Sequence, residues 1–203
     1  MVRSESVQLL EIEPSDPRSS DARVWCDQVL GPELSKAQGV RRMSTYAAFN
    51  SSRLAVVADA GLAESSPLPV GGEVPRGIKI RGLAGFLIYE IVQPGVDLDQ
   101  DHPILFTAAF TVPREWVDEF NDWYDQEHMP MIYGSRHWSV SRRYALTETH
   151  GASSTHLALH YLSDARGFDA SELKASRITP WRKKFLQQRW FVESEKMVYY
   201  RVS

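Results

Sequence analysis

The chain has 203 residues, of which 43% are hydrophobic and 24% charged, enough for one medium domain or two small ones with a packed core. Its formal net charge of −3 and isoelectric point near 6.1 argue against nucleic acid or an anionic membrane surface as the main partner. The N-terminal segment lacks an apolar stretch of signal-peptide length, and no later run is long enough to cross a bilayer. The single cysteine, Cys26, cannot form an intrachain disulfide, so we expect a cytoplasmic protein.

The first half begins with an apolar strand at 7–13, a helix at about 18–36 and a second strand at 40–49. Residues 50–82 are rich in Gly, Pro and Ser, which predicts an insertion or a long loop. The sequence GLAGFLIYEIVQ that follows is the third strand. Only VDLDQDHP remains where a second helix would be expected, so that helix is predicted to be short or absent.

The second half repeats this order more regularly. We expect a strand at 105–112, a helix at about 114–130 and a strand at 138–147. THLALHYL alternates as a strand, and DASELKASRITPWRKKFLQQ predicts a helix broken near Pro180, with Thr179 as the cap of its second part. RWFVESEKMVYYRV is expected to be the closing strand. The order β-α-β-β-α-β is the ferredoxin-like pattern.

An internal match supports this division into halves. WCDQVLGP at 25–32 and WYDQEHMP at 123–130 agree at Trp, Asp, Gln and Pro, with an offset of 123 − 25 = 98. Tyr46 and Tyr144 share that offset. A match at one fixed offset indicates a duplicated unit. We therefore predict two ferredoxin-like repeats, 1–100 and 101–203, the first degenerate and the second carrying the functional site.

The helix at 114–130 has one apolar side and one acidic side. Glu127 falls near the centre of the apolar side, between Trp123 and Met131, and His128 falls at its edge. The equivalent residues of the first half are Val29 and Leu30, which are plain hydrocarbon. A carboxylate in such a place must find a partner or shift its pKa upward, and such groups are candidates for proton transfer.

Two structural interpretations of Glu127 remain open. The carboxylate could form a buried salt bridge with Arg142 or Arg143. Alternatively, the helix could end early and leave Glu127 and His128 in water before Pro130.

The segment EFNDWYDQEHMPMI, followed by SRRYAL, resembles dimeric α+β barrel proteins and is most similar to the EthD-like group. The resemblance covers most of 104–203 and, in degenerate form, about 5–100. It implies an α+β fold in which the two ferredoxin-like repeats form an intrachain dimeric α+β barrel with antiparallel sheets. The fused protein could form a homodimer in addition.

The same resemblance implies cofactor-free chemistry on small hydrophobic carbonyl, phenolic or polyketide-like compounds, without a metal. Carried over by position, the catalytic role falls on His128, with Glu127 beside it. The first half lacks both residues, so at most one of the two pockets is expected to be active.

Other residues near this place are candidates for substrate binding. On the strand at 138–147, Arg142 and Arg143 point to opposite faces, so one of them is able to reach inward. His156 and His160 have a spacing that would chelate a metal on a helix, but in a strand they lie about 13 Å apart. The candidate substrate-binding residues are Trp123, Tyr124, Tyr133, Trp138, Arg142, Arg143, Tyr144 and His160.

These features lead to a main hypothesis and two alternatives. The main one is a cofactor-independent lyase-type enzyme or isomerase, in which His128 transfers a proton at a carbon next to a carbonyl. The first alternative is a non-catalytic binding or accessory protein for a hydrophobic metabolite. The second is a cofactor-independent monooxygenase.

Overall fold

The computed structural model describes residues 5–18, 20–36, 39–61, 74–97 and 102–202. Within these residues the strands are β1 (Glu5–Pro14), β2 (Val40–Ala48), β3 (Leu54–Gly61), β4 (Ile78–Val92), β5 (Ile104–Phe110), β6 (Trp138–His150), β7 (His156–Leu162) and β8 (Glu195–Arg201). The α-helices are α1 (Asp21–Trp25), α2 (Gly31–Lys36), α3 (Val117–Trp123), α4 (Met129–Ile132), α5 (Ser171–Ser176), α6 (Pro180–Phe185) and α7 (Arg189–Val192).

Antiparallel pairing organises the strands. Their order is β1-β3-β2-β8-β5-β7-β6-β4, which closes as a barrel. This combination of helices with an antiparallel barrel agrees with the predicted α+β class. The chain divides into two compact units, each of which has its own core. Unit 1 comprises 1–87, 144–153 and 199–203, and unit 2 comprises 88–143 and 154–198.

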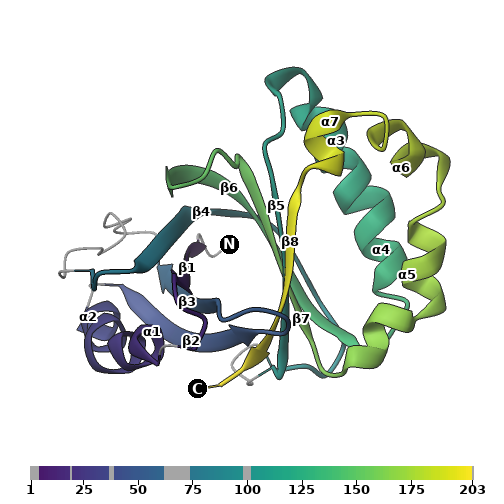
Figure 1. The fold of residues 1–203 in the computed structure, drawn as a ribbon. Coiled ribbons are helices and arrows are strands. Elements are labelled where there is room, and N and C mark those ends of the chain that lie inside the picture. The colour runs from purple at the N-terminus through teal and green to yellow at the C-terminus, as the bar shows by residue number, and fades with distance from the viewer. Residues whose placement is uncertain (1–4, 19, 37–38, 62–73, 98–101, 203) are drawn as a thin grey trace. The chain divides into compact units, whose positions relative to one another are not determined.

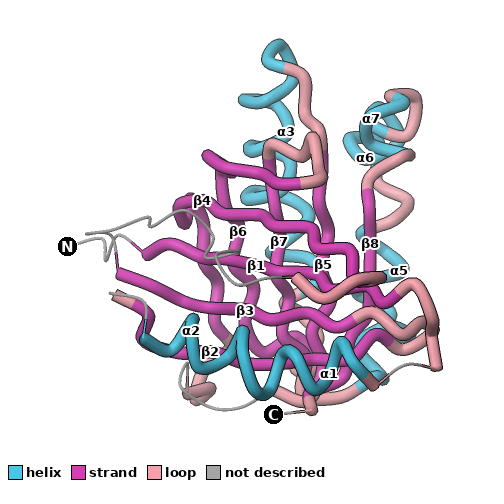
Figure 2. The backbone as a smooth tube through the Cα atoms, turned by 60° about the vertical axis from the view of Figure 1, so that its left-hand side comes forward, coloured by secondary structure: helices cyan, strands magenta, loops and turns pink. Residues whose placement is uncertain are grey.

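In unit 1, β1 pairs with β3 on one edge and with β4 on the other. Leu10 and Ile12 of β1 point toward the helices and pack in one buried cluster with Trp25, Leu30 and Leu34. The opposite face of β1 carries the alternate residues of the strand. Figure 2 shows α1 and α2 as one continuous coil beside β2 and β3.

In unit 2, β5 pairs with β7 in register from Ile104–Leu162 to Phe110–His156. Figure 1 shows helices α3 to α7 on one side of these strands. The helix–sheet interface is dominated by aromatic rings: Phe120 of α3 and Phe191 of α7 lie 5.0 and 5.8 Å from Phe110 of β5, between ring centroids. These contacts bury large apolar side chains, with the Phe120 ring inclined at 56° and the Phe191 ring at 28° to the Phe110 ring.

The helical segments of both units contain a π-helical turn just before the proline of the matched motif. These turns are η1 (Cys26–Leu30) and η3 (Tyr124–His128). The amide of Met129 bonds to the carbonyl of Tyr124, five residues back. Proline has no backbone N–H to donate to the preceding turn, and its ring would clash with a carbonyl of that turn. The wider π-helical turn makes room for the ring, so the helix can continue beyond the proline. The helix therefore continues through Pro130 to Ile132, and the expectation that it ends at the proline is wrong.

Two further sequence expectations need correction. Part of the predicted insertion at 50–82, namely 54–61, is the strand β3, which pairs with both β1 and β2. The apolar residues of this segment are typical of a strand that pairs on both edges. The Gly, Pro and Ser residues around it led to the prediction of a loop. The closing strand begins at Glu195 rather than near 189, because 189–192 form α7, which buries Phe191. Residues 62–73 of the predicted insertion lie outside the described residues.

The remaining elements match their predictions. The broken helix near Pro180 is present as α5 and α6, and the Thr179 hydroxyl accepts a hydrogen bond from the Arg182 amide as the cap of α6. The first half was expected to have a short second helix or none. The structure shows no helix at 94–97 or at 102–103, and residues 98–101 lie outside the described residues.

The close approach of β4 and β6 generates a stability prediction. A Cβ on Gly85 would overlap the carbonyl oxygen of Ala145 and lie 2.9 Å from the Cα of Leu146. Both are backbone atoms and cannot rotate away, so Gly85→Ala should lower the free energy of unfolding by at least about 2 kcal/mol. Gly95→Ala is the control, because Gly95 has φ +80° but no atom within 4 Å of the added Cβ, and it should cost only about 1 kcal/mol. Equal losses in urea denaturation would contradict the steric account.

Candidate functional site

The site begins with three rings on the inner face of the helix in unit 2. Trp123 and Tyr124 are each 2% exposed. The His128 ring stacks on Trp123 with centroids 4.7 Å apart and an interplanar angle of 19°, and it meets the Tyr124 ring edge-on at 5.0 Å. The π-helical turn brings residues five apart onto one face, which helps to place Trp123 and His128 together.

A chain of hydrogen bonds leads from this group into the sheet. The Tyr124 hydroxyl lies 3.1 Å from Nε2 of His160, and Nδ1 of His160 lies 2.7 Å from the Ser141 hydroxyl. Burial, followed by the charge of Arg143, lowers the pKa of His160 to about 3. Burial raises the pKa of Tyr124. Tyr124 and His160 are therefore both neutral near pH 7, and each needs the other's hydrogen bond.

His128 is held neutral for a related reason. Burial lowers its pKa well below 6.5, and the neighbouring His160, Arg182, Arg143 and Arg177 lower it further. Among the described residues, its Nδ1 atom is buried without a hydrogen-bond partner. A buried imidazole nitrogen normally has a partner, so this atom retains an unused hydrogen-bonding capacity.

Arg143 is the arginine that points toward the helices. Its guanidinium carbon lies 4.4 Å from the centre of the Tyr124 ring, and its nitrogens bond to Asp125 and Asn121. The side chain is 2% exposed, so water screens the attraction between its positive charge and the neighbouring groups only weakly. The sequence left open which of the two arginines would reach inward. Arg142 instead bonds to Glu90 through Nε at 2.6 Å.

Glu127 has partners that the sequence did not indicate. Its Oε1 atom accepts hydrogen bonds from Nε1 of Trp123 at 3.0 Å and from the Thr179 hydroxyl at 2.6 Å. Thr179 in turn caps α6. Among the described contacts, none joins Glu127 to His128, Arg142 or Arg143. The carboxylate therefore fixes the tryptophan on which His128 stacks and ties that helix to α6.

The other predicted residues are divided between the two units. Trp138 is buried, donates from Nε1 to the Gly167 carbonyl and meets the His160 ring edge-on at 5.4 Å. The Tyr133 hydroxyl donates to the Ile91 carbonyl at 2.9 Å. Tyr144 is buried and belongs to unit 1.

No metal cluster accompanies the imidazoles: the described residues contain no group of three His, Cys, Asp or Glu side chains placed to hold an ion. His156 and His160 lie on β7, as the alternating sequence predicted. No helix built from the described residues is long and apolar enough to cross a membrane.

Sequence reasoning missed a second polar cluster, which lies in unit 1. Glu11 of β1 is 4% exposed and bonds to Arg81 of β4 and to Tyr199 of β8. The sequence carried a signal for it, because Glu11 and Glu13 interrupt an apolar strand at alternate positions, and Lys79 and Arg81 do the same in β4. Which strands pair could not be known in advance.

Comparison with known proteins gives the fold but no family. No family model matches the chain, and no curated protein matches it. An anthrone oxidase-like protein superposes with a TM-score of 0.68 at 13% identity over 98% of this chain and 92% of its own. Chlorite dismutase from Candidatus Nitrospira defluvii gives 0.64 at 11% identity over 98% and 91%. A ferredoxin-fold protein related to antibiotic biosynthesis monooxygenases, from Listeria monocytogenes, gives 0.54 at 10% over 98% and 96%. At such identities the likeness shows the fold, which is that of dimeric α+β barrel and ferredoxin-like proteins.

The partners of Glu127 generate a prediction about stability. Glu127→Val removes the acceptor of the buried Trp123 N–H and of the Thr179 hydroxyl, so it should lower the free energy of unfolding by about 1–3 kcal/mol. Glu127→Gln keeps an oxygen acceptor of the same shape and should remain within about 0.5 kcal/mol of the unmodified protein. Urea denaturation of the three proteins measures both changes. A valine variant as stable as the unmodified protein would show that these bonds do not hold the helices together.

Proposed function

We propose that unit 2 contains an active site that removes a proton from a carbon acid, in a small hydrophobic carbonyl or phenolic compound, without a cofactor. The observation that carries the proposal is His128, a neutral imidazole with a buried, unpartnered nitrogen between two aromatic rings. General bases must be unprotonated in the resting enzyme, and the burial that lowers the pKa of His128 favours this form.

His128 is the proposed base. Its lowered pKa makes it a weak base while the site is empty. An enolate or phenolate forming next to the ring would supply a negative charge and raise its proton affinity at the moment of transfer. This requirement favours substrates whose C–H bond is already acidified by a carbonyl. Trp123, held by Glu127, supports the His128 ring by stacking and fixes its orientation.

Tyr124 is the proposed donor to the substrate oxygen. If Ser141 donates to Nδ1 of His160, then Nε2 of His160 carries the proton and donates to the Tyr124 oxygen. The Tyr124 proton is then free to bond to the developing oxyanion. This tautomer gives both nitrogens of His160 a partner and leaves the Tyr124 proton as the one group without an acceptor. The adjacent Arg143 charge favours negative charge on the tyrosine and on the substrate.

The reaction after proton removal distinguishes the candidate functions. Without oxygen, the enolate would undergo isomerisation, dehydration, cyclisation or decarboxylation, as a lyase or isomerase requires. With oxygen, an activated CH₂ and O₂ would give C=O and H₂O, as a monooxygenase requires. The anthrone oxidase-like and monooxygenase-related proteins among the fold neighbours favour testing the second outcome.

We also propose that the two halves are EthD-like tandem repeats of which only the second is active. The π-helical turns support this, because 26–30 and 124–128 differ by the same 98 residues as the sequence match. In the first half, Val29 and Leu30 replace Glu127 and His128. Burial, followed by the charge of Asp27, raises the pKa of Cys26 to about 12, so its thiol is not available as a base.

Anthrone is a suitable probe substrate, since its methylene group is acidified by a carbonyl across a fused aromatic system. Under argon in D₂O, the protein should accelerate deuterium uptake at this methylene by about 10²–10⁴-fold over buffer, as measured by NMR. His128→Ala should abolish the acceleration and cost about 1–2 kcal/mol in stability. An oxygen electrode under air then distinguishes oxygenation from proton exchange alone.

His150→Ala is the control, because His150 is exposed on β6 in unit 1, and it should exchange deuterium at the unmodified rate. Equal exchange in the two alanine variants would contradict the role of His128. Saturable binding of anthrone with no acceleration would indicate a binding protein instead.

A further inference from the structure

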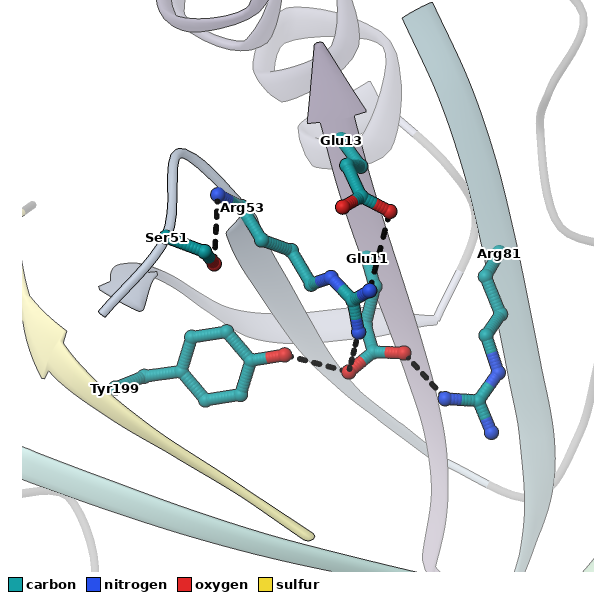
Figure 3. Close-up of polar contacts among 6 residues, drawn as sticks. All are labelled: Glu11, Glu13, Ser51, Arg53, Arg81 and Tyr199. Atoms are coloured by element: carbon teal, nitrogen blue, oxygen red, sulfur yellow. Dashed lines mark hydrogen bonds and ion pairs between the residues drawn. The ribbon is translucent and has the colours of Figure 1, made fainter. Parts of the chain in front are cut away.

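A second candidate site lies in unit 1 and does not depend on the proposed function. It is a cleft of about 430 Å³ lined by Glu11, Glu13, Arg53, Lys79, Ile80, Arg81 and Gly151. Figure 3 shows Arg53 and Arg81 reaching toward the Glu11 carboxylate from opposite sides, with Tyr199 as its third neighbour. The cleft is formed mainly by charged groups, and Ile80 is the one apolar side chain in its lining.

Strand pairing explains how the charges gather. Glu11 lies opposite Arg81 and Glu13 lies opposite Lys79 in the β1–β4 register. Since side chains alternate along a strand, all four point to one face of this sheet. Leu10 and Ile12 point to the other face, against α1 and α2. The polar cleft therefore lies on the face of the unit 1 sheet that the helices do not cover.

Glu11 is the fixed centre of the cluster. Its Oε1 accepts from the Tyr199 hydroxyl at 2.5 Å and its Oε2 from Nη1 of Arg81 at 2.6 Å. Arg53 lies 4.0 Å from Glu11 and bonds to Glu13 at 3.1 Å. Burial raises the pKa of Tyr199, and the Glu11 charge raises it further, so the tyrosine keeps its proton and donates it. Hydrogen bonds and ion pairs between these side chains therefore hold the walls of the cleft in place.

The charges in the lining do not cancel. Three cationic side chains, Arg53, Lys79 and Arg81, face two carboxylates, which leaves an excess of one positive charge. Lys79 is exposed and, within the described chain, forms no ion pair. A salt-bridge network that served only to join the strands would not need it or the open volume beside it.

We propose that this cleft binds a small polar oxyanion, a carboxylate or a phosphate, with Lys79 and Arg53 as its electrostatic partners. Guanidinium and ammonium groups pair well with such anions, and partial burial strengthens the attraction. Glu11 and Glu13 would repel a ligand with several negative charges, so a compact anion with hydroxyl groups is preferred. Its hydroxyl groups would donate to the carboxylate of Glu13, which is half exposed.

The test uses two probes, glycolate and inorganic phosphate, added to the full-length ¹⁵N-labelled protein. Gly151 is one of the lining residues, so its amide signal reports on this cleft. We expect its NMR signal to shift saturably with at least one probe, and the tighter of the two identifies the oxyanion. Lys79→Gln should weaken that binding by about fivefold, the size expected for one partly exposed charge.

Lys36→Gln is the matched control, because Lys36 is an exposed lysine at the end of α2 and outside the cleft lining. It should leave the affinity unchanged. The proposal is overturned if neither probe shifts Gly151 saturably up to about 50 mM, far weaker than ordinary ligand affinities. It is also overturned if both lysine variants weaken binding equally, because the effect would then be one of net charge alone.

Discussion

The packing of two imidazole rings among the aromatic side chains of unit 2 is the constraint on which the candidate site depends. Removing a charged imidazole from water is costly, so His128 and His160 are held neutral. Once neutral, a ring has one donor and one acceptor nitrogen to satisfy. His160 satisfies both through Tyr124 and Ser141, whereas His128 leaves Nδ1 unpaired. That difference is the reason for proposing His128, and not His160, as the reactive histidine.

The surrounding packing maintains this arrangement. Trp123 is fixed at one edge by Glu127 and lies against Phe185 and Phe191, with ring centroids at 5.2 and 5.5 Å. Glu127 is fixed by Thr179, which begins α6. For the carboxylate of Glu127, which the sequence suggested as a proton carrier, these contacts favour a positioning role instead. Displacement of α6 would loosen the packing of Trp123, on which His128 stacks, so the proposed base and its support belong to one cooperative packing unit.

Local patterns in the sequence predicted much of this. The apolar side of the helix at 114–130 placed Trp123, Tyr124 and His128 together, and alternation along β7 placed His160 on a strand. Partners distant in the chain could not be predicted, since Thr179 lies 52 residues from Glu127 and Tyr199 lies 188 residues from Glu11. The π-helical turn was also missed, because it depends on how the backbone accommodates Pro130 and leaves no mark in the spacing of the hydrophobic residues. β3 was missed because its neighbours have the composition of a loop.

The central claim is that burial keeps His128 and His160 neutral throughout the physiological range. The most direct measurement is the pH dependence of the imidazole ¹⁵N resonances in the labelled protein, assigned with His128→Ala and His160→Gln variants, with free histidine as the internal standard. Between about pH 8 and pH 5 free histidine protonates, and the account predicts that both buried rings keep the chemical shifts of neutral imidazole. Protonation of His128 or His160 in step with the free histidine would contradict it.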